Sequence, residues 1–173
     1  KMTKNKIEIL IPTYNEGNNI GRVLKELNQN GYYNITILDA NSSDKTVDVA
    51  KKYNCKIILD GKNISGFGGS VINGLKNLTS EFFCIFDGDG SFNPSDLKFM
   101  IEKIDQGYDF VFASRYVDNA VSDDDTIITK IGNYFFTKIV SIFFKIPTTD
   151  LLFLYVLGRS SKVSKLNLNN KDF

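Results

Sequence analysis

The sequence contains no histidine and only two cysteines among its 173 residues. Catalysis by histidine and histidine-rich metal sites are therefore excluded, and any metal must be held by oxygen ligands, which favours Mg²⁺ or Mn²⁺. Cys55 and Cys84 each lie in an apolar, strand-like segment, without the spacing of a metal site. We interpret them as two buried thiols in a reducing compartment.

An excess of charge of one sign and long apolar runs are also missing. The chain has 21 Lys and Arg residues against 20 Asp and Glu residues, so we expect no general attraction to nucleic acid. No run reaches the roughly 18 uncharged apolar residues of a membrane-spanning helix. Residues 1–6 are polar and lack the apolar core of a signal peptide. We therefore expect a cytoplasmic protein.

Short apolar segments alternate with segments of helical periodicity. The predicted strands are Ile7–Ile11, Ile35–Leu38, Lys56–Leu59, Phe82–Phe86 and Phe110–Ala113, and the predicted helices are Asn18–Asn28, Lys45–Tyr53, Ser70–Leu78 and Ser95–Gln106. The strands are nearly unbroken runs of apolar residues, as in strands covered on both faces. The alternation predicts an α/β fold, with an open and mainly parallel sheet sandwiched by helices. Ligands of such folds bind beyond the carboxyl ends of the strands.

The pattern changes after Ala113. An acidic segment at 123–125 precedes Ile127–Lys145, which predicts one long aromatic helix, and Leu151–Leu157 is a further apolar run. This predicted helix has too few residues and too many charges to span a bilayer. Its lysines would allow it to lie among lipid headgroups, and the alternative is that its aromatic side chains pack on the edge of the sheet.

Polar loops with carboxylates follow three of the predicted strands: Pro12–Gly17, Asp39–Asp44 and Asp87–Ser91. Because the carboxyl ends of parallel strands meet at one edge of the sheet, we expect the loops to form one composite site. Asp, Asn and Ser are also the usual residues that cap helices, and for Asp44 this alternative stays open.

Asp87 and Asp89 leave a buried strand two residues apart, so they lie on the same side of an extended chain. Two such carboxylates repel each other unless a cation lies between them or one is protonated. A divalent ion that joins them to a diphosphate removes this repulsion. An EF-hand is excluded because its sixth and twelfth positions are Phe92 and Lys98. A solvated glycine turn and a haloacid-dehalogenase-type phosphohydrolase remain as alternatives.

A glycine-rich segment, Ser65–Gly69, leads into the third predicted helix. Its backbone N–H groups could bind phosphate, and a plain tight turn is the alternative. It follows the third strand instead of the first, which does not fit the dinucleotide-binding fingerprint.

Four motifs in order resemble those of family 2 glycosyltransferases, especially the dolichol-phosphate mannosyltransferase-like group. They are Ile11–Glu16, Asp39–Thr46, Asp87–Ser91 and Ala113–Arg115, and the similarity extends from Ile7 to Arg159. The resemblance implies a GT-A fold, a UDP- or GDP-sugar donor, and Mg²⁺ or Mn²⁺. We expect a single domain over 1–173 with a nucleotide-sugar-binding half (1–115) and an acceptor-side half (116–173). The polar, asparagine-rich end suggests that the chain belongs to a longer protein.

The resemblance also implies a role for individual residues. The donor would be bound by Pro12, Tyr14 and Glu16 around the base and ribose, Asp39 on the nucleobase, Gly68 in the glycine loop, and Asp87 and Asp89 at the metal and diphosphate. The residues implied in catalysis are Arg115, as a cation that meets phosphate or acceptor, and Asp150, as the candidate base.

The chain departs from the family pattern at several positions. It has Ala40, Phe67, Leu154 and Val156 where the family has a second Asp, a Lys, a Gly and an Arg. A non-catalytic homologue that binds nucleotide sugars therefore remains an alternative to an inverting transferase. The expected acceptor is a polyprenyl phosphate or a glycan. A hydroxyl acceptor needs a base such as Asp150, whereas a phosphate is already ionised and needs none.

Overall fold

The computed structural model describes residues 2–61, 64, 66–114, 137, 150 and 153–168. The chain divides into two compact units. The first consists of Lys1–Val111 together with Val156–Phe173, and the second is Phe112–Tyr155. The helices and strands described below lie in the first unit, apart from the last residue of β5.

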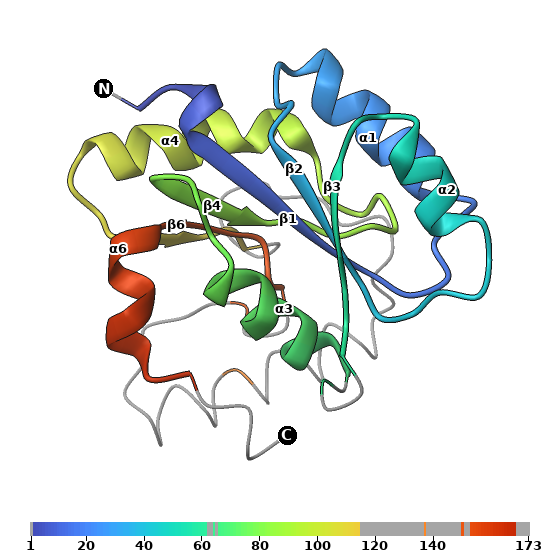
Figure 1. Cartoon of the computed structure of the whole chain (residues 1–173). Helices are drawn as coiled ribbons and strands as arrows, with labels where there is room; N and C mark the ends of the chain where they lie inside the picture. The colour runs from blue at the N-terminus through green and yellow to red at the C-terminus, as the bar shows by residue number, and fades with distance from the viewer. Residues whose placement is uncertain are drawn as a thin grey trace. The chain divides into compact units, whose positions relative to one another are not determined.

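The sheet has six strands in the order β3-β2-β1-β4-β6-β5 (Figure 1). Their bounds are β1 Ile7–Thr13, β2 Ile35–Asp39, β3 Lys56–Leu59, β4 Phe82–Ile85, β5 Phe110–Phe112 and β6 Val156–Arg159. The α-helices are α1 Ile20–Gln29, α2 Thr46–Lys51, α3 Gly66–Lys76, α4 Leu97–Asp105 and α6 Ser160–Val163. Short 3₁₀ helices occur at η1 Lys4–Lys6, η2 Pro94–Asp96 and η3 Ser164–Leu166.

The centre of the sheet is parallel and buried. Strand β1 pairs in parallel with both β2 and β4, and every residue of these three strands is buried. Such burial on both faces explains why their sequences are nearly unbroken apolar runs. The same prediction is wrong for β3, where Lys56 and Leu59 are exposed because this strand lies at an edge of the sheet.

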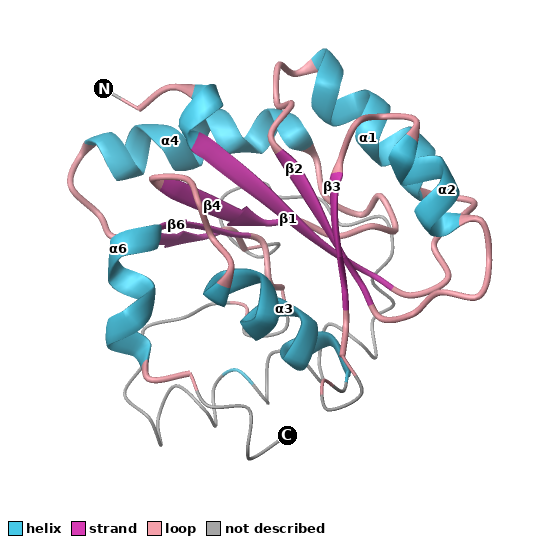
Figure 2. Cartoon of the chain, viewed as in Figure 1, coloured by secondary structure: helices cyan, strands magenta, loops and turns pink. Residues whose placement is uncertain are grey.

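Helices cover both faces of the sheet (Figure 2). The buried residues of α1 are Ile20, Val23, Leu24 and Leu27, whose spacing of three and four places them on one face of the helix. Helices α1, α2 and α4 lie on one side of the sheet and α3 on the other. These crossovers direct the carboxyl ends of β1 to β4 to one edge, so the loops that follow them are neighbours.

Strand β6 is antiparallel to β4, and sequence periodicity did not predict it as a strand. It overlaps the predicted apolar run Leu151–Leu157 by two residues only. A Cβ atom at Gly158 would lie 2.6 Å from Cδ1 of Phe110 and 2.9 Å from Cε1 of Phe83, so the strand fits there because residue 158 has no side chain. The sheet is therefore mainly parallel, as predicted, with one antiparallel strand inserted.

The predicted long helix Ile127–Lys145 lies outside the described residues, except for Thr137, which is helical and buried. Within the described part of the chain, we find no helix with the length and apolar character needed to cross a bilayer.

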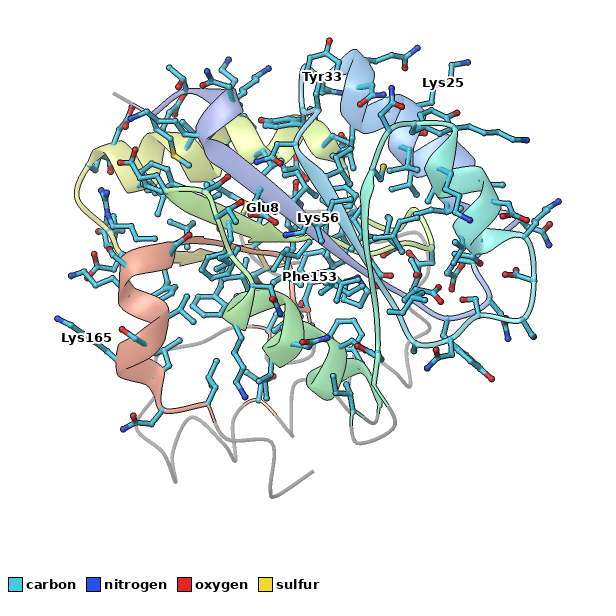
Figure 3. The ribbon with its side chains drawn as sticks, viewed as in Figure 1. Glu8, Lys25, Tyr33, Lys56, Phe153 and Lys165 are labelled. Atoms are coloured by element: carbon cyan, nitrogen blue, oxygen red, sulfur yellow. The ribbon has the colours of Figure 1, made fainter. Side chains whose placement is uncertain are left out.

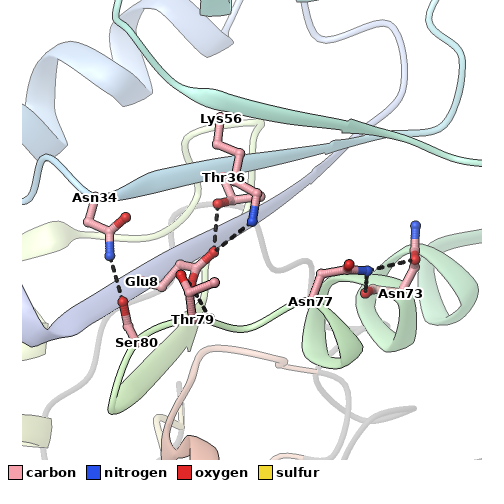
Figure 4. Close-up of polar contacts among 8 residues, drawn as sticks. All are labelled: Glu8, Asn34, Thr36, Lys56, Asn73, Asn77, Thr79 and Ser80. Carbon is pink, nitrogen blue, oxygen red and sulfur yellow. Dashed lines mark hydrogen bonds and ion pairs between the residues drawn. The ribbon is translucent and has the colours of Figure 1, made fainter.

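A buried carboxylate, that of Glu8, connects strands β1, β2 and β3. It lies away from the loops that follow the carboxyl ends of these strands. Glu8 in β1 is 1% exposed and accepts hydrogen bonds from the Thr36 hydroxyl at 2.8 Å and from the Thr79 N–H at 3.1 Å (Figure 4). The ammonium of Lys56 in β3 lies 3.9 Å from the same carboxylate (Figure 3). Because a buried charge requires such partners, this cluster is a structural feature that links three strands.

Candidate functional site

The loops after β1 and β2 are joined by reciprocal hydrogen bonds. Asn15 has a positive φ of 58°, and its side-chain oxygen accepts from the Ser43 N–H at 2.9 Å. Its own N–H donates to the Ser42 hydroxyl at 2.9 Å. The neighbouring Tyr14 is left 64% exposed. An exposed aromatic ring on a fixed loop is suited to pack against a flat ligand such as a nucleobase.

The other two residues predicted to surround the base and ribose differ in exposure. Pro12 is buried in β1 and pairs with Leu38 of β2. Glu16 is half-buried, and its carboxylate accepts a hydrogen bond from the Asn19 side chain at 2.9 Å. Of the three, Tyr14 and Glu16 have side-chain surface available to a ligand.

Asp39, at the end of β2, is 1% exposed. Its carboxylate accepts hydrogen bonds from the Thr13 hydroxyl at 3.0 Å, the Ser42 N–H at 2.8 Å and the Ser42 hydroxyl at 2.6 Å. These contacts hold the two loops to the sheet. The Asp39 carboxylate is therefore already occupied by donors of the protein itself, a feature that the sequence motif did not reveal.

Asp44 lies one residue before the N-cap of α2, Lys45, and its side chain binds the first residue of the helix, as the capping alternative from the sequence requires. Its carboxylate accepts hydrogen bonds from the hydroxyl and the N–H of Thr46, the first residue of α2, and from the Gly17 N–H at 2.9 Å. The Thr46 hydrogen bonds in particular lower the pKa of this exposed carboxyl group. Asp44 thus starts a helix and joins the same two loops.

Asp87 and Asp89 lie in the loop that follows β4, and Glu16 is near enough for its charge to act on Asp87. Asp87 is half-buried and Asp89 is exposed. The pKa of Asp87 is raised, first by burial, then by the charge of Asp89 and to a smaller extent by that of Glu16. Carboxylates from two loops, Glu16 after β1 and the pair Asp87 and Asp89 after β4, therefore concentrate negative charge around Asp87.

The carboxylate oxygens of the pair suit a hard divalent cation. Asp87 Oδ1 accepts from the Asp89 N–H at 3.3 Å, and Asp89 Oδ1 accepts from the Ser91 N–H at 2.7 Å. The Gly88 N–H also lies close enough to the Asp87 carboxylate to oppose the rise of its pKa, and the described residues contain no group of three acidic or thiol side chains that could hold a metal. Two carboxylates that leave other positions to phosphate and water are a usual arrangement for Mg²⁺.

Arg22 is a residue of this region that the sequence analysis missed. Its side chain donates from Nη2 to the carbonyl oxygen of Asp89 at 3.1 Å. One feature of the sequence could have indicated a special role for Arg22. It is a cation in the first turn of α1, where the helix dipole disfavours positive charge.

Residues 66–69 of the glycine-rich segment belong to α3, which begins at Gly66, four residues before the predicted start. Gly68 is exposed, and a Cβ atom built on it would have no neighbour within 4 Å. Phe67 is 49% exposed. Packing within the described residues therefore does not require glycine at position 68.

The predicted catalytic residues belong to the second unit. Arg115 lies outside the described residues. Asp150 is buried, at 4% exposure, and engaged in interactions. Nearby in the sequence, Leu154 is half-buried, and the Ala113 N–H donates to the Tyr155 carbonyl at 2.9 Å. The described contacts therefore bring Glu16 to Asp87 and Asp89 and join the loops that contain Tyr14 and Asp39, whereas no described contact connects Gly68 with them.

Solved structures with the same fold define the structural class. Glucosyl-3-phosphoglycerate synthase from Mycobacterium tuberculosis, in a complex with Mn²⁺, UDP-glucose and glycerol 3-phosphate, matches 90% of this chain with a TM-score of 0.68 and 12% identity. The match covers 57% of that chain. This likeness establishes the fold as that of the GT-A glycosyltransferases.

Sequence comparison then identifies the family. The chain belongs to glycosyl transferase family 2, because the sequence profile of that family matches residues 8–165. It is 31% identical to the dolichol-phosphate mannosyltransferase of Pyrococcus furiosus over 144 residues, which are 79% of this chain and 38% of that protein. It is 29% identical to the UDP-N-acetylglucosamine–dolichyl-phosphate N-acetylglucosaminyltransferase of Methanococcus voltae over 152 residues, 76% of this chain and 61% of that protein. The chain thus spans less than two thirds of the length of these relatives.

Proposed function

We propose that the chain is the donor-binding catalytic domain of an inverting, metal-dependent glycosyltransferase that uses a nucleoside diphosphate sugar. The observation that supports this most directly is the carboxylate pair Asp87 and Asp89 at the end of β4, with Glu16 close to it. Neighbours of the same fold contain Mn²⁺ with UDP or UDP-glucose. Family membership favours this function over the phosphohydrolase alternative.

Five of the predicted donor residues in the first unit have a distinct role in this proposal. Tyr14 packs against the base, and Glu16 lies beside the ribose. Asp87 and Asp89 would hold Mg²⁺ or Mn²⁺, and the chemistry that such an ion would supply is neutralisation of the diphosphate charge. Gly68 leaves space and backbone N–H groups at the start of α3 for phosphate oxygens. These residues thereby fix the anomeric carbon in position for attack from the opposite side.

The proposed acceptor is a lipid-linked phosphate. Two of the relatives are named for transfer to dolichol phosphate or dolichyl phosphate. An ionised phosphate oxygen attacks without the help of a base, and Arg115 is the proposed cation that attracts it. A glycan hydroxyl would instead require Asp150 to take up a proton.

The decisive experiment measures binding of UDP- and GDP-sugars with and without Mn²⁺ by thermal shift and calorimetry. A ligand that binds the folded state raises the apparent stability. We expect one nucleotide class to bind, with a component that needs Mn²⁺ and disappears in Asp89→Ala. Glu102→Ala, which removes an exposed carboxylate from α4, is the matched control.

Two results would contradict the proposal. Donor binding by Asp89→Ala with full Mn²⁺ dependence would exclude the metal role of this residue. Donor binding by the wild type without transfer to any acceptor and without donor hydrolysis would instead support the non-catalytic alternative, which Phe67 and Leu154 keep open.

A further inference from the structure

The side chain of Arg22 connects helix α1 to the loop that contains Asp87 and Asp89. Its Nη2 atom donates to the Asp89 carbonyl oxygen at 3.1 Å, and its Nη1 atom donates to Glu26 Oε1 at 3.4 Å. Because Glu26 lies one turn further along α1, the guanidinium is held from two directions. The planar, five-donor geometry of arginine permits both contacts at once.

The glycine at position 90 is what allows this approach. Gly90 has a φ of 90°, and a Cβ atom built on it would lie 2.0 Å from Nη2 and 2.7 Å from Nη1 of Arg22. Any side chain here would displace the guanidinium, because contacts this short do not occur between non-bonded atoms. Gly90 and Arg22 are therefore complementary in shape.

The other hydrogen bonds of this loop are internal. The Asp89 N–H donates to Asp87, and the Ser91 N–H donates to Asp89. Among the hydrogen bonds of the described residues, the one from Arg22 is alone in joining residues 87–91 to another helix or strand. Two neighbouring carboxylates repel each other, and Arg22, although its side chain is 52% exposed, attaches their loop to α1 from outside.

We propose that Arg22 is a positioning residue that holds Asp89 beside Asp87 in the geometry that a divalent cation needs. This inference rests on the proposed function, since it assigns a role towards the proposed metal. Arg22 acts through the Asp89 backbone and does not itself need to contact the metal or the donor. A preorganised pair binds a cation more tightly because less order has to be imposed on binding.

Two measurements test the role of Arg22. In the metal-free protein, hydrogen–deuterium exchange of residues 87–91 is expected to be faster in Arg22→Ala than in the wild type. In the presence of UDP or GDP, whichever binds, Mn²⁺ affinity measured by electron paramagnetic resonance is expected to fall about tenfold, the effect of losing one charged hydrogen bond. Arg22→Lys, which keeps the charge but not the fork, is expected to recover part of the affinity.

Lys25→Ala is the matched control, because Lys25 is another exposed cation on α1 (Figure 3). It is expected to bind Mn²⁺ as the wild type does, which separates position from net charge. If folded Arg22→Ala or Arg22→Lys keeps wild-type Mn²⁺ affinity and exchange, or if Lys25→Ala loses as much affinity, the inference is wrong and the proposed function stands. If the wild type shows no nucleotide-dependent Mn²⁺ binding, the proposed function is wrong and the inference is wrong with it.

Discussion

Asp87 experiences burial and repulsion from two neighbouring carboxylates, all of which favour its protonated form. Its pKa is raised for these reasons. The folded protein therefore holds this proton more tightly than the unfolded chain does. As a consequence, the contribution of Asp87 to stability decreases as the pH rises from the usual value of 3.8 through the raised pKa.

Removal of this charge is expected to stabilise the metal-free protein. Asp87→Asn keeps the shape of the side chain and should raise the thermal midpoint at pH 7, with a gain that disappears below pH 3.8, the usual aspartate pKa. The midpoint is measured by circular dichroism across this pH range. Glu102→Gln should leave the midpoint almost unchanged, and a lower midpoint for Asp87→Asn at pH 7 would contradict this account of the charge.

Gly68 is a residue that the packing of the described fold does not require, so its role in donor binding can be tested by substitution. Because its helical position is open, Gly68→Ala should stabilise the protein by about 0.5–1 kcal/mol through the reduced flexibility of the unfolded chain. If the donor diphosphate approaches this backbone, the same methyl group should weaken donor binding. Urea unfolding and calorimetry measure the two effects, and an unchanged affinity would remove Gly68 from the site.

The sequence predicted which residue types gather at the strand ends, but it did not predict how they contact one another. The pair Asp87 and Asp89 could be predicted because both residues come shortly after a run of apolar residues that forms a buried strand. Arg22 and Ser42 were missed because their contacts depend on the path of a loop and on packing between distant segments. Periodicity describes one segment at a time, and therefore contains no information on such contacts.

At the scale of elements, the loops after β1 and β2 act as one unit through Asn15 and Ser43. Asn15→Gly preserves the positive φ at position 15 and removes the side-chain oxygen that binds Ser43. We expect weaker nucleoside diphosphate binding even without metal, because Tyr14 is no longer held in place. Asn54→Gly is the matched control, since Asn54 also has a positive φ, 55°, but lies after α2. Equal affinity of both variants and the wild type would exclude this role.

The helices and parallel strands were predicted well because each is a local pattern. Strands β1, β2 and β4 correspond to nearly unbroken apolar runs, and α1 to a clear apolar stripe. Strand β6 was missed because its partner β4 is more than 70 residues away in the sequence and its own four residues include a glycine and an arginine. Such pairing is decided by tertiary packing, which overrides local preference.

At the scale of the whole molecule, the acceptor determines what Asp150 must do. With a polyprenyl phosphate acceptor, we expect Asp150→Asn to retain transfer within about tenfold, because no proton has to be removed. With a glycan hydroxyl acceptor, loss of a general base is expected to cost about 10²–10⁴-fold. The assay compares transfer to the two acceptors by the wild type and by Asp150→Asn. A large loss with the phosphate acceptor would contradict the proposed chemistry.

Strand β3 has consequences for handling the protein in solution. It lies at the edge of the described sheet, and Leu59 is 58% exposed there. Edge strands with apolar side chains promote aggregation between copies, and charged residues such as the neighbouring Lys56 counteract it. We expect Leu59→Lys to delay aggregation at high concentration, as measured by light scattering, without changing the thermal midpoint. Aggregation through this edge of the sheet would then limit how long the purified protein stays monodisperse in storage.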